Sequence, residues 1–377
     1  MVKIAKEKEI ISQLLAFGNI TPNGNKPWDI TIHNEAFYGR VLSRGSLGLG
    51  ESYMEGWWDC RELDQFFYQL MHGSLNHKLK LNLTMVAHYL KNRILNLEKK
   101  SRAFNLKHYD IGNNLYVKML DKRMTYTCGC WENAENLDQA QEAKLELVCR
   151  KIGLKPGMKI LDIGCGWGSF MKYAAERYGV TCVGITISQS QIDLGKQMCQ
   201  GLPIEFRLQD YRDTQGQYDA VVSLGMFEHV GFKNYRTYMK LVHKCLKDDG
   251  LFLLQTIGSN SSNPAHTSDP WIKKYVFTTG ALPSAKQISG SVENLFIMED
   301  WHNFGADYDK TLMAWCRNFE THWPEFEKDY GAVFYRMWRY YLLSCAGSFR
   351  NRSIQLGQVV FSKTGVPGGY KLVRSLN

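Results

Sequence analysis

Residues 159–178 carry the groups that a cradle for a small ligand needs. The short apolar run 159–163 predicts a buried strand, and residues 169–178 predict a helix whose free N-terminal N–H groups point back toward the loop before it. An acid and three alternating glycines lie at the end of the run and in this loop: Asp162, Gly164, Gly166 and Gly168. Because glycine lacks a Cβ atom, this backbone can turn sharply and lie against a ligand.

The spacing of the glycines discriminates between ligands. A dinucleotide-binding fingerprint has a third glycine at the position of Ser169 and an acidic residue after its second strand. In this chain the second strand ends in Thr186. Asp162 can instead face a cationic amino-acid group, such as that of S-adenosylmethionine. We therefore predict a site for S-adenosylmethionine, with another nucleotide-binding loop as the alternative.

Two further acids follow predicted strands. Asp210 can accept a hydrogen bond from an adenine amino group while Tyr211 flanks the ring, although Asp210 is equally explained as a loop acid. Glu228 brings a carboxylate to the same edge, and a helix cap or a salt bridge is its structural alternative.

The elements that must position these residues alternate from residue 158 onward. Apolar runs at 159–163, 181–186, 203–208, 218–225, 250–257, 293–300 and 357–362 predict strands, and helical patterns follow most of the early ones. This alternation predicts an α/β fold with a mostly parallel sheet covered on both faces, in which ligands lie beyond the carboxyl ends of the strands.

The N-terminal hundred residues carry weaker signals. Residues 28–33 alternate like an edge strand, and glycines at 45, 48, 50 and 56 predict a loop-rich patch. Residues 76–107 hold eight Lys or Arg against one acid, a net charge of +7, with an apolar stripe at helical spacing. Such a segment fits an anionic membrane surface or a solvated helix docked on its own protein. No recognition motif for nucleic acid accompanies the charge.

Composition sets wider limits. A length of 377 residues predicts one large domain plus a smaller one, and aromatic residues at 13% indicate an apolar pocket. The ten cysteines show neither CxxC pairs nor zinc-site spacing, so we expect reduced thiols in the cytoplasm and no metal site. We find no secretory signal and no run long enough to cross a bilayer.

Several long motifs together resemble the cyclopropane-fatty-acyl-phospholipid synthases. They are 126–128, 161–168, 184–188, 225–231, 301–308 and 346–350, in the family's order and over nearly the whole chain. The resemblance implies a Rossmann-like class I methyltransferase with a seven-stranded sheet and a smaller N-terminal α+β domain. It also implies transfer of a methylene group from S-adenosylmethionine to the cis double bond of acyl chains in phospholipids.

The same resemblance implies the site residues. The cofactor would contact Tyr126, Thr127, Asp162, Gly164, Gly166, Gly168, Thr186, Gln191, Gln209, Asp210 and Tyr211. In the implied mechanism the alkene attacks the methyl group, and a bound bicarbonate ion removes a proton from the resulting carbocation. The matching bicarbonate positions are Cys128, Glu228, Ile257 through its backbone N–H, and Tyr308.

Gln255 and Cys345 are two further candidate site residues. Gln255 stands where the family commonly has histidine. A glutamine keeps a hydrogen-bond donor at this position but lacks a group that titrates near neutral pH. Cys345 lies in a family-like segment and is either an essential thiol or, as we favour, a buried helix thiol.

These expectations combine into one hypothesis. Residues 1–105 would form a basic membrane-docking domain and 106–377 the catalytic domain of a cytoplasmic enzyme that associates with the inner face of the membrane. Unsaturated phospholipids and an anionic surface are the expected partners, and a homodimer stays open. The alternatives are a lipid methyltransferase whose product is methyl-branched or carries a methylene, and a membrane-binding module that only holds the cofactor.

Overall fold

The protein forms two compact units, each discontinuous in sequence. The computed structural model describes residues 2–72, 112–263, 269–277 and 280–375. Of these, residues 2–72, 269–277 and 319–353 make the first unit, and the remainder make the second. The domain boundary predicted near residue 105 lies outside the described residues. Residues 269–277 and 319–353, which the prediction placed in the catalytic domain, belong to the first compact unit.

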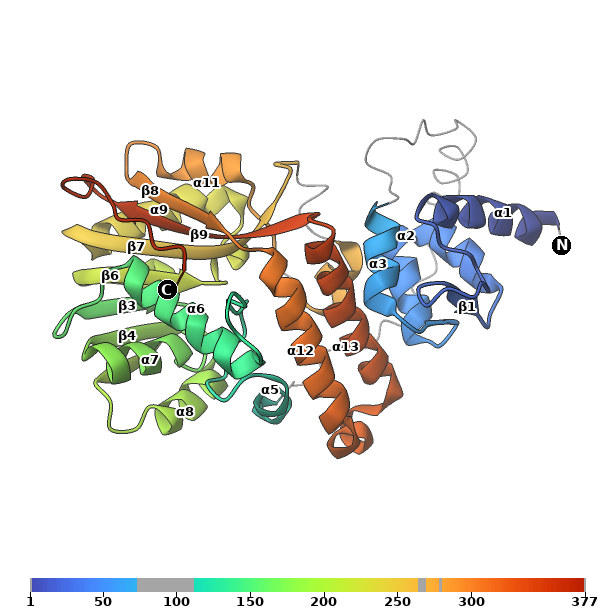
Figure 1. The fold of residues 1–377 in the computed structure, drawn as a ribbon, viewed down its shortest axis with the longest axis horizontal. Helices are drawn as coiled ribbons and strands as arrows, with labels where there is room; N and C mark the ends of the chain where they lie inside the picture. Colours follow the sequence, from blue (N-terminus) through green and yellow to red (C-terminus); the bar gives the residue numbers. More distant parts are fainter. Residues whose placement is uncertain (1, 73–111, 264–268, 278–279, 376–377) are drawn as a thin grey trace. The chain divides into compact units, whose positions relative to one another are not determined.

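The second unit is built on a seven-stranded sheet, drawn from green to red in Figure 1. Its strands follow the order β5-β4-β3-β6-β7-β9-β8, so the order reverses between β3 and β6. The first five are parallel neighbours, whereas β9 is antiparallel to both β7 and β8. The bounds are β3 Lys159–Ile163, β4 Thr181–Thr186, β5 Ile204–Leu208, β6 Tyr218–Leu224, β7 Leu246–Ser259, β8 Ile297–Asn303 and β9 Ile354–Ser362. This arrangement confirms the predicted fold class.

Helices cover both faces of this sheet. The core on one face includes side chains of α6 and α7, such as Val148 and Phe170, and the core on the other includes side chains of α9 and α11, such as Val242 and Ile288. Burial of these apolar faces holds the strands in place. The helices of the unit are α5 Asn113–Met119, α6 Leu137–Lys151, α7 Ser169–Tyr178, α8 Gln189–Met198, α9 Tyr235–Cys245, α11 Ala285–Val292 and α12 Ala306–His322, which continues into the first unit. Short 3-10 turns lie at η2 Tyr211–Asp213, η3 Phe227–His229 and η4 Phe232–Asn234.

Most predicted strands occupy their predicted positions, and β8 differs most. The prediction of 293–300 begins four residues too early because α11 ends at Val292 and Asn294 takes a left-handed conformation with φ 57°. Helix α7 spans the predicted 169–178.

The first unit is mainly helical. It contains α1 Val2–Phe17, β1 Ile30–Ile32, α2 Ala36–Met54, β2 Trp58–Cys60, α3 Leu63–His72, α10 Pro270–Tyr275, η6 Trp323–Glu325 and α13 Glu327–Arg350. Strands β1 and β2 pair antiparallel, which agrees with the strand predicted at 28–33. None of the helices in the described part of the chain is both long and apolar enough to span a membrane.

The loop-rich patch predicted from glycines 45, 48 and 50 is wrong, because these residues lie in α2. Gly45 forms a kink, with φ 57° and ψ −135°. A Cβ atom at Gly50 would approach the Trp271 ring to 2.3 Å. Gly50 therefore permits close packing of α2 against α10, which a sequence pattern alone does not reveal.

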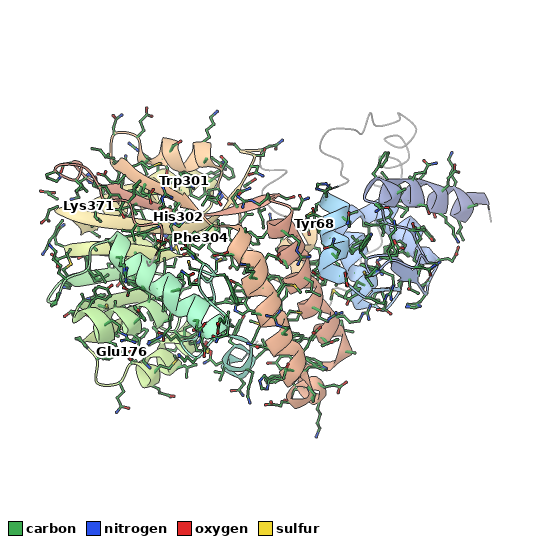
Figure 2. All side chains as sticks on the ribbon, in the orientation of Figure 1. Tyr68, Glu176, Trp301, His302, Phe304 and Lys371 are labelled. Carbon is green, nitrogen blue, oxygen red and sulfur yellow. The ribbon has the colours of Figure 1, made fainter. Side chains whose placement is uncertain are left out.

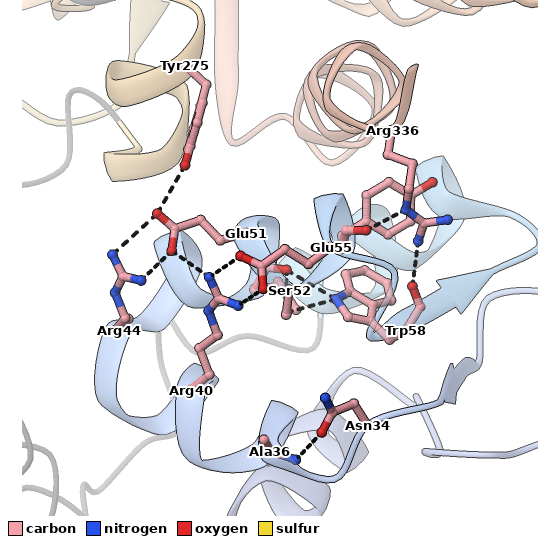
Figure 3. A network of polar contacts seen from close by, with 12 residues as sticks. Asn34, Ala36, Arg40, Arg44, Glu51, Ser52, Glu55, Trp58, Tyr275 and Arg336 are labelled. Atoms are coloured by element: carbon pink, nitrogen blue, oxygen red, sulfur yellow. Dashed lines mark hydrogen bonds and ion pairs between the residues drawn. The ribbon is translucent and has the colours of Figure 1, made fainter. Parts of the chain in front are cut away.

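A buried carboxylate joins α2 to α10 within the first unit (Figure 3). Glu51 is 3% exposed and pairs with Arg40, Arg44 and Lys274, and it accepts a hydrogen bond from the hydroxyl of Tyr275 at 3.1 Å. Because a buried carboxylate is costly without partners, these contacts explain why residues 269–277 pack with the N-terminal residues.

Candidate active site

The loop between β3 and α7 lies at the carboxyl edge of the sheet, next to the point where the strand order reverses. Gly164 and Gly166 have φ values of 85° and 54°, a region that disfavours side chains. A Cβ atom at Gly164 would meet Met226 at 2.6 Å, whereas a Cβ atom at Gly166 would enter open space. The loop therefore leaves open space over Gly166, beside the helix N-terminus.

Asp162 lies under this loop and is 2% exposed. Burial raises the pKa of its carboxyl to about 7, and the positive charge of Lys144 opposes that rise. Burial likewise lowers the pKa of Lys144 to about 8, against the negative charges of Asp121 and Asp162. The cradle thus rests on a buried acid and a buried amine that stabilise one another's charged forms.

The next two strands bring the other predicted cofactor residues to the same edge. The Thr186 hydroxyl at the end of β4 donates to Gln191 Oε1 on α8 at 2.7 Å. The backbone N–H of Gln209 donates to the carbonyl of Thr186 at 3.0 Å. Asp210 caps η2 and accepts two side-chain hydrogen bonds from Arg212, which lower its pKa to about 2. Its carboxylate stays an acceptor at neutral pH.

The segment Tyr126–Cys128 is held against the end of β6. The Lys144 amine donates to the Thr127 hydroxyl at 2.9 Å, and the Gln141 amide donates to the Thr127 carbonyl at 2.7 Å. A Cβ atom at Gly225, just beyond β6, would meet Thr127 Cγ2 at 2.9 Å. Two buried polar side chains of α6 therefore place this segment.

A continuous series of aromatic rings runs from the glycine loop to Tyr308. The ring centroids of Trp167 and Tyr116 are 5.2 Å apart, and those of Tyr116 and Tyr126 are 5.1 Å apart. Trp315 continues the series at 5.1 Å from Tyr126 and 5.9 Å from Tyr308. Such rings exclude water and attract positive charge to their faces.

Glu228 lies in η3, beyond β6, and is 6% exposed. Its Oε1 atom accepts the backbone N–H of Ile257 at 2.7 Å, while its buried Oε2 atom has no partner within the described chain. Burial raises the pKa of Glu228 to about 7. Gln255, two residues before Ile257 on β7, is fully buried, and its Nε2 atom also has no partner among the described residues.

Helix α12 carries Tyr308 and contacts the Cys128 segment through Thr311. The Thr311 hydroxyl oxygen accepts the Gly129 N–H at 3.1 Å and lies 3.9 Å from Cys128 Sγ. Tyr308 precedes Thr311 by three residues and so shares its helix face. Burial raises the pKa of the Cys128 thiol well above its usual range, so the thiol stays protonated and suits positioning rather than attack.

Sequence reasoning missed the buried amines of α6. Lys144 and Lys151 are both fully buried, although lysine is normally placed on an exposed face. The two lysines are seven residues apart, or two helical turns, and so lie on the same helix face as the apolar Val148. This spacing was the sequence signal that could have predicted their burial. Cys345 belongs to the first unit, and its place in the site stays a prediction.

Comparison with known proteins identifies the family. Residues 97–359 match the mycolic acid cyclopropane synthetase family. The chain belongs to this family. It is 50% identical to the cyclopropane-fatty-acyl-phospholipid synthase of Escherichia coli strain K12 over 367 residues, which cover 97% of this chain and 95% of that protein.

Solved structures of the mycolic acid cyclopropane synthetase family share the fold. The cyclopropane synthase MmaA2 from Mycobacterium tuberculosis is 29% identical, with a TM-score of 0.64 over 68% of this chain and 96% of that chain. The mycolic acid cyclopropane synthase CmaA1, solved with S-adenosylhomocysteine (SAH) and CTAB, is 30% identical, with a TM-score of 0.64 over 71% of this chain and 100% of that chain.

The site can be tested against the ligands expected for this family. The open space beside Gly166, at the N-terminus of α7, suits a ligand that lies against backbone. The unpartnered Glu228 Oε2 and Gln255 Nε2 suit a small group that both accepts and donates hydrogen bonds. The residues present fit a sulfonium nucleoside at the loop and hydrogen carbonate beside β7.

Proposed function

We propose that the protein is a cyclopropane-fatty-acyl-phospholipid synthase, which converts the cis double bond of a phospholipid acyl chain into a cyclopropane ring. The observation that carries this proposal is the 50% identity to the Escherichia coli synthase over nearly the full length of both chains. The buried Glu228 and the aromatic series ending at Tyr308 supply the chemical groups that the reaction requires.

The cofactor residues hold and orient S-adenosylmethionine, which supplies an electrophilic methyl group. Asp162 would face the amino-acid end of the cofactor, and Thr186 with Gln191 would contact the ribose. Asp210 accepts from the adenine amino group. Holding the methyl group in line with the double bond is the main demand, because an alkene is a weak nucleophile.

The aromatic residues protect the cation that forms on the acyl chain. Tyr126, Trp315 and Tyr308 lie in one series of ring contacts, and all three belong to the unit that carries the glycine loop. Their rings keep water away and favour positive charge. Because Cys128 stays protonated, it does not trap the cation as a thiolate.

Hydrogen carbonate, when bound, supplies the base that closes the ring. Glu228 Oε2 would accept its hydroxyl proton, and Gln255 Nε2 and the Tyr308 hydroxyl would donate to its oxygens. The Ile257 N–H, which the family resemblance assigned to this anion, is engaged by Glu228 in the structure and so acts by orienting that carboxylate. The hydrogen bond from the Ile257 N–H fixes the position of Glu228 Oε1 and leaves Oε2 as the atom that would face the anion.

The substrate requires contact with a membrane, because the double bond lies within a lipid tail. We assign this contact to the basic residues 76–107, which lie outside the described residues, and we place the enzyme in the cytoplasm at the inner face of the membrane. The charge of this segment would attract an anionic leaflet.

The test is incubation with methyl-labelled S-adenosylmethionine and vesicles of unsaturated phospholipid. We expect labelled acyl chains that are one CH2 heavier and lack olefinic signals in NMR. A labelled chain that keeps an olefinic signal would favour the alternative, a methyltransferase that stops before ring closure. Absence of label in lipid, with SAH still bound, would overturn both and favour a module that only holds the cofactor.

A further inference from the structure

A row of polar side chains crosses three neighbouring strands beside the proposed anion site. Gln255 on β7 is in register with Gln358 on β9. Gln358 is in register with His302 on β8, which is labelled in Figure 2. Gln255 and Gln358 are fully buried, as is Lys151, which reaches the row from α6. Because buried polar groups are costly unless they are hydrogen-bonded, the contacts within this row decide how each amide is oriented.

The direction of these hydrogen bonds follows from Lys151. Its amine donates to Gln358 Oε1 at 2.8 Å. Since a lysine ammonium can only donate, the oxygen of the Gln358 amide must face it and the nitrogen must face away. That nitrogen donates to Gln255 Oε1 at 2.9 Å. The Gln255 amide is thereby turned with its NH2 group outward from the row, where it has no partner in the described residues.

The direction is fixed while the amine is an ammonium, which has no acceptor, and the neutral amine can keep it. Burial lowers the pKa of Lys151 to about 7, and the nearby Asp300 opposes the shift while Arg374 adds to it. Loss of one proton still leaves two N–H bonds on the amine. The other neighbour of the amine is His302 Nδ1, at 2.9 Å. Burial lowers the pKa of His302 to about 4, so at neutral pH its ring is uncharged and Nδ1 can accept.

We infer that Gln358 and Lys151 are positioning residues that hold the Gln255 amide with its NH2 group toward the bound anion. The inference rests on the proposed function. Gln255 lies two residues before Ile257, about 7 Å along the strand, and the Ile257 N–H holds Glu228. An anion between them receives a hydrogen bond from Gln255 and gives one to Glu228. We call the two hydrogen-bonded amides of Gln358 and Gln255, held by Lys151, the relay. The relay replaces the titratable histidine ring that the family commonly has at position 255.

Gln358→Glu tests the relay with almost no change in shape. A carboxylate at 358 still accepts from Lys151 but cannot donate to Gln255, so the Gln255 amide turns over and presents its oxygen to the anion. We expect the dissociation constant of 13C-labelled hydrogen carbonate, measured by NMR line broadening in CO2-depleted buffer, to rise at least about tenfold. Affinity for SAH should change less than about twofold, and Gln217→Glu, at an exposed glutamine, should match the wild type.

A double variant separates positioning from a general structural role. If Gln358 acts through Gln255, Gln255→Ala with Gln358→Glu binds hydrogen carbonate no more weakly than Gln255→Ala alone. If Gln358→Glu fails to fold, Gln358→Met takes its place, with an expected loss of at least about threefold because the Gln255 amide is then unanchored. Unchanged anion affinity in the folded variant, or additive losses in the double variant, would overturn the inference.

The anion measurement needs neither lipid nor turnover. Failure of the proposed lipid activity and failure of the relay are therefore seen separately. A wild-type protein that binds hydrogen carbonate and shows the Gln358 effect without modifying lipid would retain the relay and reject the proposed reaction. Ring formation with no measurable effect of Gln358→Glu on the anion would do the reverse.

Discussion

Glu228 is a carboxyl group in surroundings that favour its protonated form. Burial raises its pKa to about 7 from an ordinary value of 4.5. The protonated carboxyl therefore contributes fully to the free energy of unfolding below the unfolded pKa of 4.5, and this contribution is lost as the pH rises through 7. Glu228→Gln lacks this loss, so its stability relative to the wild type should increase by about 2 to 3 kcal/mol between pH 5 and pH 8. Urea unfolding of both proteins at the two pH values measures the difference.

The same variant should lose activity while it gains stability. We expect kcat to fall at least about tenfold because a glutamine at this position no longer supplies a full acceptor charge. Glu135→Gln removes the same charge at an exposed position and should change neither quantity. Parallel stability profiles for Glu228→Gln and the wild type would contradict the proposed effect of burial.

At the scale of elements, the turn between β3 and α7 is expected to bind the cofactor through its backbone. Gly166 and Gly153 offer a matched pair, since their φ values are 54° and 60° and an added Cβ atom would meet nothing within 4 Å at either. Alanine at either position should therefore cost similar stability, about 1 kcal/mol. Only Gly166→Ala should weaken SAH binding, by at least about tenfold in calorimetry, because the new methyl group occupies the space of the cofactor.

Equal SAH affinities for Gly166→Ala and Gly153→Ala would show that the open space beside Gly166 is not the cofactor site. Gly153 follows α6 and precedes β3, at the opposite end of that strand from the loop, and so controls for strain alone.

At the scale of the whole molecule, charge is concentrated in one segment. The chain has a net charge of +9, of which residues 76–107 contribute +7. Binding to anionic vesicles should therefore fall steeply between low and high NaCl concentration in a sedimentation assay. A variant with four cations of this segment changed to glutamine should bind at least about tenfold more weakly: Lys91, Arg93, Lys99 and Lys100.

A control variant has the same net charge but keeps the basic segment. It changes four exposed lysines of the second unit to glutamine: Lys155, Lys196, Lys233 and Lys244. Equal loss in the two variants would indicate general electrostatic attraction rather than a docking segment. Binding that does not respond to salt would reject the electrostatic account.

The sequence by itself determined the strand, the glycine turn and the helix of the cofactor loop. These depend on local properties, namely apolar period, positive φ at glycine and the free N–H groups of a helix start. The order of such units along the chain also predicted the sheet. The glycines of α2 led to a wrong prediction of loop because glycine is required both in tight turns and where a helix packs closely on a distant ring, as Gly50 does on Trp271.

Only the tertiary structure decided which polar residues are buried and which way their hydrogen bonds run. Gln358 meets Gln255 across 103 positions of sequence and Lys151 across 207. No local pattern carries information about partners so distant, and a lysine in a helix is expected to face water. The pairing of β7 with β9 and the packing of α6 on the sheet create the contacts that orient Gln255. They bring the Lys151 ammonium, which can only donate, against the Gln358 amide, which would otherwise turn either way.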